Sequence, residues 1–269
     1  IQASSSRNVS LTGSDDGQYN HDLYMNYVDQ LEKSKNNKAI LLYVNSPGGT
    51  VYESDELYLK LMEYKEKTKR PVYAYFGSQA CSGAYYISMA ADKIYTNRNT
   101  WTGSIGVIVS LTNYKKLYDK LGIKEIDITS GKNKSMGSGG LDLTDEQRDI
   151  LQSLVDEAYD QFAGIVSEGR GLDINTVKKI ADGRIYSAKQ AKEKGLVDEI
   201  GSEDELKALI RKENKLGKDI VYDVAKSSGS DFLSGLMGSV QKIMPKSDSE
   251  LAVDIVENKG KGVLMYYAD

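Results

Sequence analysis

Short apolar runs alternate with amphipathic stretches along the first two-thirds of the chain. The runs Ala39–Val44 and Pro71–Phe76 show no polar alternation, which is typical of strands that are covered on both faces, as in a parallel sheet. Lys93–Thr96 predicts a third, shorter strand. Each run is followed by a turn and then by a stretch with helical periodicity, so the pattern predicts an α/β fold with a buried sheet.

The helical stretches follow the same alternation. Leu23, Tyr27 and Leu31 recur every four residues, so 20–35 predicts a helix. Thr144 precedes two acidic residues, which marks the start of a helix that runs to about residue 168. We expect further helices at 53–68, 112–121, 175–181, 187–195 and 203–213, a strand at 124–129 and a loop at 130–140.

The ends of the chain differ from its middle. Residues 1–19 are polar and predict a loop or disordered segment, which we expect to be truncated from a longer protein. Residues 20–224 form the expected main domain. Residues 225–269 are rich in Ser, Gly and Lys and predict a flexible tail that ends in an apolar peptide, 262–269. No run approaches the roughly 20 apolar residues of a membrane span.

Composition narrows the possible chemistry. The net charge of −4 and the pI near 5.3 give no indication of the basic surface that binds nucleic acid. Cys81 is the only cysteine, so an internal disulfide is excluded. His21 is the only histidine, so a Ser–His–Asp or Cys–His mechanism would have to use it, and zinc sites of several His or Cys are excluded. We expect no metal and no cofactor.

Two glycine-containing turns follow the predicted strands. In Asn45–Gly49, NSPGG, a proline and two glycines allow a turn whose bare N–H groups converge, as an oxyanion hole requires. In Ala80–Ala84, small residues flank Ser82, which suits a nucleophile at a strand-to-helix turn. Each motif alone is also compatible with an ordinary tight turn.

A serine hydroxyl needs a base. With a single, remote histidine in the chain, the candidates are Lys, Asp and Glu, and a lysine can serve if burial disfavours its ammonium form. Lys134 and Lys132 lie in the loop SGKNKSMGSGG, and the pattern alone does not choose between them.

Taken together, the motifs resemble the signal peptide peptidase A family. They occur in the same order and at similar spacing over residues 20–205: NSPGG, Ala80–Tyr86, Ala90–Lys93, Thr102–Gly106, Ser130–Lys134, Ile180–Arg184 and Ala191–Asp198. Five or more motifs in register are specific where one is weak.

The resemblance implies a role for each matching residue. Ser82 would be the nucleophile and Lys134 the general base, with Lys132 on a variable position. Ser104 would orient the lysine, and Gly49 and Gly83 would form the oxyanion hole. The implied fold is the ClpP/crotonase-like spiral of repeated ββα units, and 20–224 becomes a protease domain.

The family also implies a cellular setting. We expect a homo-oligomeric ring of about eight subunits in which neighbouring subunits contribute catalytic groups. The substrates would be remnant signal peptides or other membrane-associated peptides. The protease domain would lie on the extracytoplasmic face of a bacterial cytoplasmic membrane, with an N-terminal anchor outside this chain.

The sequence leaves open the nucleophile, the class of protein and the role of the C-terminal peptide. Cys81 stands where the family commonly has a small apolar residue, so the thiol beside Ser82 is a second possible nucleophile. A crotonase-like acyl-CoA enzyme or a non-catalytic scaffold could share the fold. The apolar end, 262–269, could lie in an active-site groove as an added strand, or dock on a neighbour.

Overall fold

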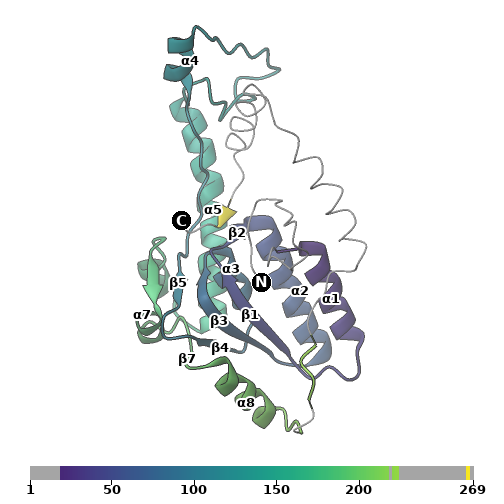
Figure 1. Ribbon diagram of the computed structural model, residues 1–269. Helices are drawn as coiled ribbons and strands as arrows, with labels where there is room; N and C mark the ends of the chain where they lie inside the picture. Colours follow the sequence, from purple (N-terminus) through teal and green to yellow (C-terminus); the bar gives the residue numbers. More distant parts are fainter. Residues whose placement is uncertain (1–18, 218–219, 224–264, 267–269) are drawn as a thin grey trace.

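The computed structural model describes residues 19–217, 220–223 and 265–266 (Figure 1). The helices are α1 (His21–Lys33), α2 (Val51–Thr68), α3 (Gly83–Ser88), α4 (Lys115–Leu121), α5 (Asp145–Arg170), α6 (Ile174–Ile180), α7 (Ala188–Glu193) and α8 (Glu203–Glu213). The strands are β1 (Ile40–Ser46), β2 (Gly49–Thr50), β3 (Val72–Cys81), β4 (Lys93–Thr96), β5 (Trp101–Gly103), β6 (Ile185–Ser187), β7 (Glu199–Ile200) and β8 (Met265–Tyr266).

Strand β3 is the centre of a six-stranded sheet. Strand β1 pairs with it in parallel on one side. On the other side β4 pairs with its first half and β5 with its last three residues, Gln79–Cys81, also in parallel. Strand β7 extends the sheet beyond β4, and β6 adds an antiparallel edge beside β5. Because β3 is flanked along its length, its carboxyl end and that of β5 meet at one edge of the sheet.

The two faces of β3 are covered by different helices. Val72, Ala74 and Phe76 point into the main core, which α2, α3 and α5 complete. The alternate residues Tyr73 and Tyr75 pack against Leu206 and Ile210 of α8 on the opposite face. The unbroken apolar run is thus explained by a strand that is buried on both faces.

The segment between β5 and α5 projects from this body as an arm, 107–144, that carries α4 at its tip (Figure 1). Helix α5 begins in the arm and ends against the core. Its N-terminus has a capping box, in which Thr144 and Gln147 each bond the other's backbone N–H. The arm exposes many apolar side chains, with Ile126 72% and Ile128 99% accessible to solvent.

The structure confirms the predicted α/β class and most of the elements. Helix α8 has the predicted bounds, and β4 is Lys93–Thr96 as expected. The predicted strand at 124–129 is wrong: these residues form no strand, because the arm offers no sheet edge for them to pair with. The helix predicted from 112 begins at Lys115. The division at 224 stays a prediction, and most of the tail lies outside the described residues.

Candidate active site

Ser82 lies at the sharp turn between β3 and α3. Its backbone has φ +54° and ψ −122°, a conformation that costs a non-glycine residue about 1–3 kcal/mol. The Ser82 N–H donates to the Gly103 carbonyl (2.8 Å), and its own carbonyl accepts from Tyr86 in the first turn of α3 (2.9 Å). These bonds, together with the strand on one side and the helix on the other, hold the turn in its strained geometry.

The Ser82 hydroxyl is fully buried, and its Oγ has no hydrogen-bond partner among the described residues. A buried hydroxyl without a partner costs folding free energy, so its position in the fold calls for an explanation, such as a catalytic role.

Cys81 does not compete as a nucleophile in this setting. Its side chain is buried, and burial raises the pKa of the thiol to about 12. The thiol therefore stays protonated at neutral pH, and it lies against the Trp101 carbonyl (Sγ to O, 3.6 Å). The structure favours Ser82 over Cys81.

The structure brings Ser104 to the same edge as Ser82. Cys81 and Gly103 are register partners in β3 and β5, so the residues that follow them are neighbours. Ser104 is buried, has φ +49°, and donates its N–H to the Arg184 carbonyl (2.8 Å). Gly103 has φ +85° and lies so close to Tyr186 that a side chain would not fit.

The NSPGG turn lies across from α3. Gly48 has φ +126°, and its N–H is bonded to Ser46 Oγ (3.2 Å), so the Gly48 N–H is not available to a substrate. Gly49 is then the candidate oxyanion donor from this turn. Gly49 and Gly83 line one cavity of about 20 Å³, so the structure brings both predicted oxyanion residues together.

Lys134 is not brought to Ser82 within one chain. The carbonyl of Lys132 accepts from Gln147 in the first turn of α5 (3.3 Å), and Lys134 is two residues away, within about 7 Å. The core end of α5 reaches α3 through Gln161, which donates to Tyr86 Oη (2.7 Å). Fourteen residues of helix separate Gln147 from Gln161, a rise of about 21 Å.

The surroundings of the two lysines differ. Lys132 forms an ion pair with Glu146 (2.7 Å), whereas Lys134 is exposed and forms no ion pair with any described residue. His21 is held by Tyr19 and Glu56 through both ring nitrogens, so it is not positioned as the base of Ser82.

Sequence reasoning missed two contributions to the site. The Arg184 carbonyl, which fixes Ser104, and Tyr19, which lines the cavity beside Gly49, both come from distant parts of the chain. Arg184 closes the motif Ile180–Arg184, but the role of its carbonyl and the position of Tyr19 both depend on tertiary placement, which the sequence does not show.

Comparison with known proteins agrees with this geometry and defines the class as a peptidase family. A model described as peptidase family S49 matches residues 64–217, and one described as Clp protease matches residues 2–102. This chain belongs to peptidase family S49. The resemblance to signal peptide peptidase A is confirmed, and the Clp protease match supports the expected ClpP-like fold.

Individual relatives share much of the sequence. A protein of Enterococcus faecium that is named as a signal peptide peptidase SppA is 43% identical over 82% of this chain. One of Methanocaldococcus jannaschii that is named as a protease is 42% identical over 80% of this chain and 69% of its own length. The chloroplastic serine protease SPPA of Arabidopsis thaliana is 29% identical over 79% of this chain.

The chain spans 64% of the Enterococcus relative and 32% of the Arabidopsis one. Among solved structures, a ClpP1 mutant from Listeria monocytogenes aligns with a TM-score of 0.45 and 20% identity, over 70% of this chain and 89% of that one.

Proposed function

We propose that this chain is a serine endopeptidase that cleaves remnant signal peptides or other membrane-associated peptides through an acyl-enzyme on Ser82. The observation that carries the proposal is the strained, buried Ser82, whose Oγ has no hydrogen-bond partner in the described part of the chain and which lies beside the two glycines of the candidate oxyanion hole. Membership of peptidase family S49 and the name of the Enterococcus relative support the reaction and the substrate class.

The proposed reaction has two steps. Lys134, as a neutral amine, takes the Ser82 proton while Oγ bonds to the scissile carbonyl carbon, and the Gly49 and Gly83 N–H groups stabilise the oxyanion. The C–N bond then breaks, and the leaving amine takes the proton from Lys134. Water attacks the ester by the same route and releases Ser82. Because the amine must be neutral, activity should rise toward alkaline pH.

We propose that Ser82 and Lys134 meet across two copies of the chain. The length of α5 between them within one copy supports this arrangement, as does the exposure of Lys134. Ser104, beside Ser82, would then receive and orient a lysine from the neighbour.

The exposed arm supports the homo-oligomer that such an arrangement needs. Apolar side chains of Leu117, Leu121, Ile123, Ile126 and Ile128 are each at least half accessible to solvent in a single copy. Contact with another copy would bury them. A closed ring of about eight subunits would repeat one such contact and use every arm.

The C-terminal peptide is a proposed ligand of the same site. Strand β8 pairs antiparallel with β2, with Tyr266 opposite Gly49 and Met265 opposite Thr50. A peptide added at this position has the backbone arrangement expected of a substrate beside the oxyanion hole. We therefore propose that the tail occupies the groove as a product or self-inhibitor.

We also propose that the protease domain acts at the outer face of a bacterial cytoplasmic membrane, held by an anchor outside this chain. The proposed substrates support this, because signal peptides are left in the membrane. Among the described residues, no helix has the length and apolar character to cross a membrane.

Labelling with a fluorophosphonate tests the proposal. The assembled protein should be labelled at Ser82, as located by mass mapping, and should hydrolyse an apolar peptide. Ser82→Ala should abolish both. Turnover of an acyl-CoA thioester without labelling would instead favour a crotonase-like enzyme, and a folded oligomer that leaves peptide intact would favour a scaffold.

A further inference from the structure

A small cavity opens beside the candidate oxyanion hole. Its volume of about 20 Å³ is close to the minimum that holds one water molecule, and hence about one methyl group. It is lined by residues of β1, the NSPGG turn, α2 and α3, and by Tyr19 from before α1: Tyr19, Ser46, Gly48, Gly49, Thr50, Glu53, Ser54, Gly83, Ala84 and Ile87.

Most of this wall is fixed by the fold. The glycines belong to the two turns of the site, and Ala84 and Ile87 are buried in α3. Ser54 is tied to the Thr50 carbonyl (2.7 Å) in the first turn of α2. Tyr19 differs because it is the one large side chain that no helix or strand holds in place.

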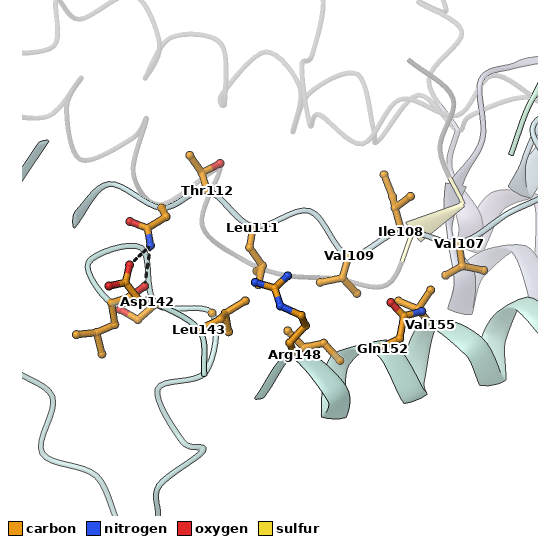
Figure 2. Close-up of a pocket in the computed structure, with 15 residues that line it drawn as sticks. Val107, Ile108, Val109, Leu111, Thr112, Asp142, Leu143, Arg148, Gln152 and Val155 are labelled. Carbon is orange, nitrogen blue, oxygen red and sulfur yellow. Dashed lines mark hydrogen bonds between the residues drawn. The ribbon is translucent and has the colours of Figure 1, made fainter. Parts of the chain in front are cut away.

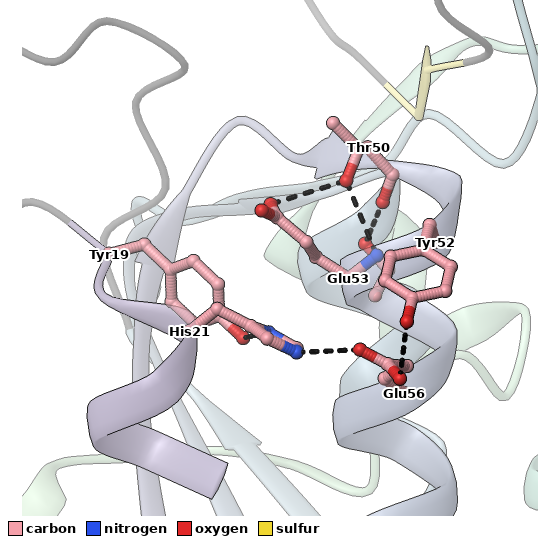
Figure 3. Close-up of polar contacts among 7 residues, drawn as sticks. Tyr19, His21, Thr50, Tyr52, Glu53 and Glu56 are labelled. Carbon is pink, nitrogen blue, oxygen red and sulfur yellow. Dashed lines mark hydrogen bonds and ion pairs between the residues drawn. The ribbon is translucent and has the colours of Figure 1, made fainter.

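Side-chain contacts hold Tyr19 instead. Its ring stacks on Tyr24, with centroids 5.4 Å apart and planes 9° apart. Its hydroxyl lies 2.7 Å from His21 Nδ1, and His21 Nε2 lies 2.9 Å from Glu56 Oε2 (Figure 3). Tyr52 donates to the other oxygen of Glu56 (2.7 Å).

The Tyr19 hydroxyl is protonated. Burial, and then the charge of Glu53, raises the pKa of Tyr19, so the hydroxyl keeps its proton. Each ring nitrogen of His21 can donate or accept a hydrogen bond, so Nδ1 bonds the Tyr19 hydroxyl while Nε2 bonds Glu56. Every group in the line Tyr19–His21–Glu56 is then satisfied, which fixes the position of the Tyr19 ring.

We propose that Tyr19 is a specificity-determining residue, which closes the pocket for the substrate side chain on the acyl side of the scissile bond, and that His21 and Glu56 are its positioning residues. The inference rests on the proposed function, since it assigns the pocket to a substrate of Ser82. The acyl-side residue is selected to be small. The side chain of alanine is one methyl group and fits this cavity. The side chain of leucine requires Tyr19 to move, because the cavity has no room for further carbon atoms.

Two peptides that differ only in alanine or leucine on the acyl side test the proposal with the full, assembled chain. The quantity measured is the ratio of kcat/KM for the two peptides. The parent should prefer alanine. Tyr19→Ala should shift the ratio toward leucine by at least about tenfold, the effect expected for one or more methylenes in a pocket.

The positioning roles are tested with milder variants. His21→Ala keeps Tyr19 but frees it, so the ratio should shift in the same direction and by less. Tyr19→Phe keeps the ring and its stacking on Tyr24 and should shift the ratio least. Tyr52→Phe is the matched control, because it loses a hydroxyl bonded to Glu56 outside the pocket, and it should keep the parent ratio.

The outcomes are distinguishable. A parent that cleaves neither peptide and is not labelled at Ser82 would defeat the proposed function, and this inference with it. An active parent whose ratio is unchanged in Tyr19→Ala and His21→Ala would overturn the inference alone, as would an equal loss on both peptides. If Tyr19→Ala does not fold, His21→Ala decides, with fluorophosphonate labelling as the check that the site is formed.

Discussion

Ser82 and Ser104 occupy equivalent places at the ends of two paired parallel strands. Each follows the last residue of its strand, those last residues are register partners, and each serine has a positive φ. Adjacent strands lie about 4.8 Å apart, so the two serines are held side by side by backbone alone. One edge of the sheet thus presents both a candidate nucleophile and a candidate partner for its base.

Replacing Ser104 tests this pairing. Ser104→Ala should lower kcat by roughly 100-fold, the effect of a base misplaced by about 1 Å, while KM changes little. The check is steady-state hydrolysis of an apolar peptide, with thermal unfolding to show that the fold is kept. Ser110→Ala, at an exposed serine after the same strand, is the control and should retain parent activity. Equal kcat values for the two variants would rule out a role for Ser104.

The buried thiol of Cys81 should be unreactive at neutral pH. Because the pKa of Cys81 is raised to about 12, the thiolate is scarce throughout the neutral range. Iodoacetamide should label the folded protein slowly at pH 7 and the urea-unfolded protein rapidly. Cys81→Ala should keep peptide hydrolysis and fluorophosphonate labelling. Loss of labelling in Cys81→Ala, with the fold intact, would return Cys81 to consideration as the nucleophile.

Glycine 103 should be intolerant of a side chain. A Cβ there would come within 2.7 Å of the Tyr186 ring at φ +85°, so Gly103→Ala should destabilise the fold by about 2–4 kcal/mol and displace Ser104. Gly164→Ala in α5 meets no atom within 4 Å and should stabilise by about 0.8–1 kcal/mol. Urea unfolding of both variants measures the contrast, and similar changes of the same sign would contradict it.

The pair Arg170–Asp198 should make stability depend on acid pH. Burial raises the pKa of Asp198, but the Arg170 guanidinium (2.8 Å) and the Ile94 N–H (2.7 Å) outweigh it and lower the pKa overall. A lowered pKa stabilises the fold above the unfolded value, and this stability is lost as the pH falls through the folded one.

The variant Asp198→Asn isolates that contribution. At pH 7 its free energy of unfolding should be about 1.5 kcal/mol lower than that of the parent, the lower end of the range for hydrogen bonds to charged groups. The lower end applies because 37% of the Asp198 side chain is accessible and solvent screens its charge. Urea unfolding of parent and variant, repeated down to about pH 3, should show the difference shrinking. A constant difference across the series would contradict the linkage.

Mixing two inactive variants tests whether the dyad spans copies. Ser82→Ala and Lys134→Ala should each be inactive alone. When they are unfolded together and reassembled, some interfaces combine an intact Ser82 with an intact Lys134, and roughly a quarter of the parent activity should return for random mixing of two equal populations. Lys132→Ala should remain active. No recovery in a mixed oligomer would place the dyad within one chain.

The sequence predicted those parts whose signals are local. The apolar runs that became β1 and β3 stand out because neither has polar alternation. Strand β3 is buried on both faces, as such a run predicts, whereas β1 is buried on one face only and Tyr43 on its other face is 47% accessible to solvent. The turns at Asn45–Gly49 and Ala80–Ala84 were recognisable from glycine and small residues. The two turns lie beside one cavity because β1 and β3 are parallel, so that their carboxyl ends meet at a single edge of the sheet.

The prediction failed where tertiary contacts, and not the local sequence, determine the structure. We expected a strand at 124–129, but the arm exposes Ile126 and Ile128 of this segment to solvent, and none of the described strands pairs with it. The pocket on the arm, formed by Val107–Thr112 and the first turns of α5, likewise has no local signal (Figure 2). Contacts of Tyr19 with a turn 30 residues away depend on how α1 packs on α2, which periodicity does not encode.

The length of α5 has a consequence for the time before assembly. In a newly folded copy, the amine of Lys134 lies near the start of α5 and the hydroxyl of Ser82 lies near the core. The two groups are too far apart to react together. On the proposed arrangement a single copy is inactive, whether or not its own tail occupies the groove. When the protein is diluted and its subunits separate, the rate should fall more than in proportion to the protein concentration. Activity would then be confined to places where the local concentration of the chain is high enough for assembly.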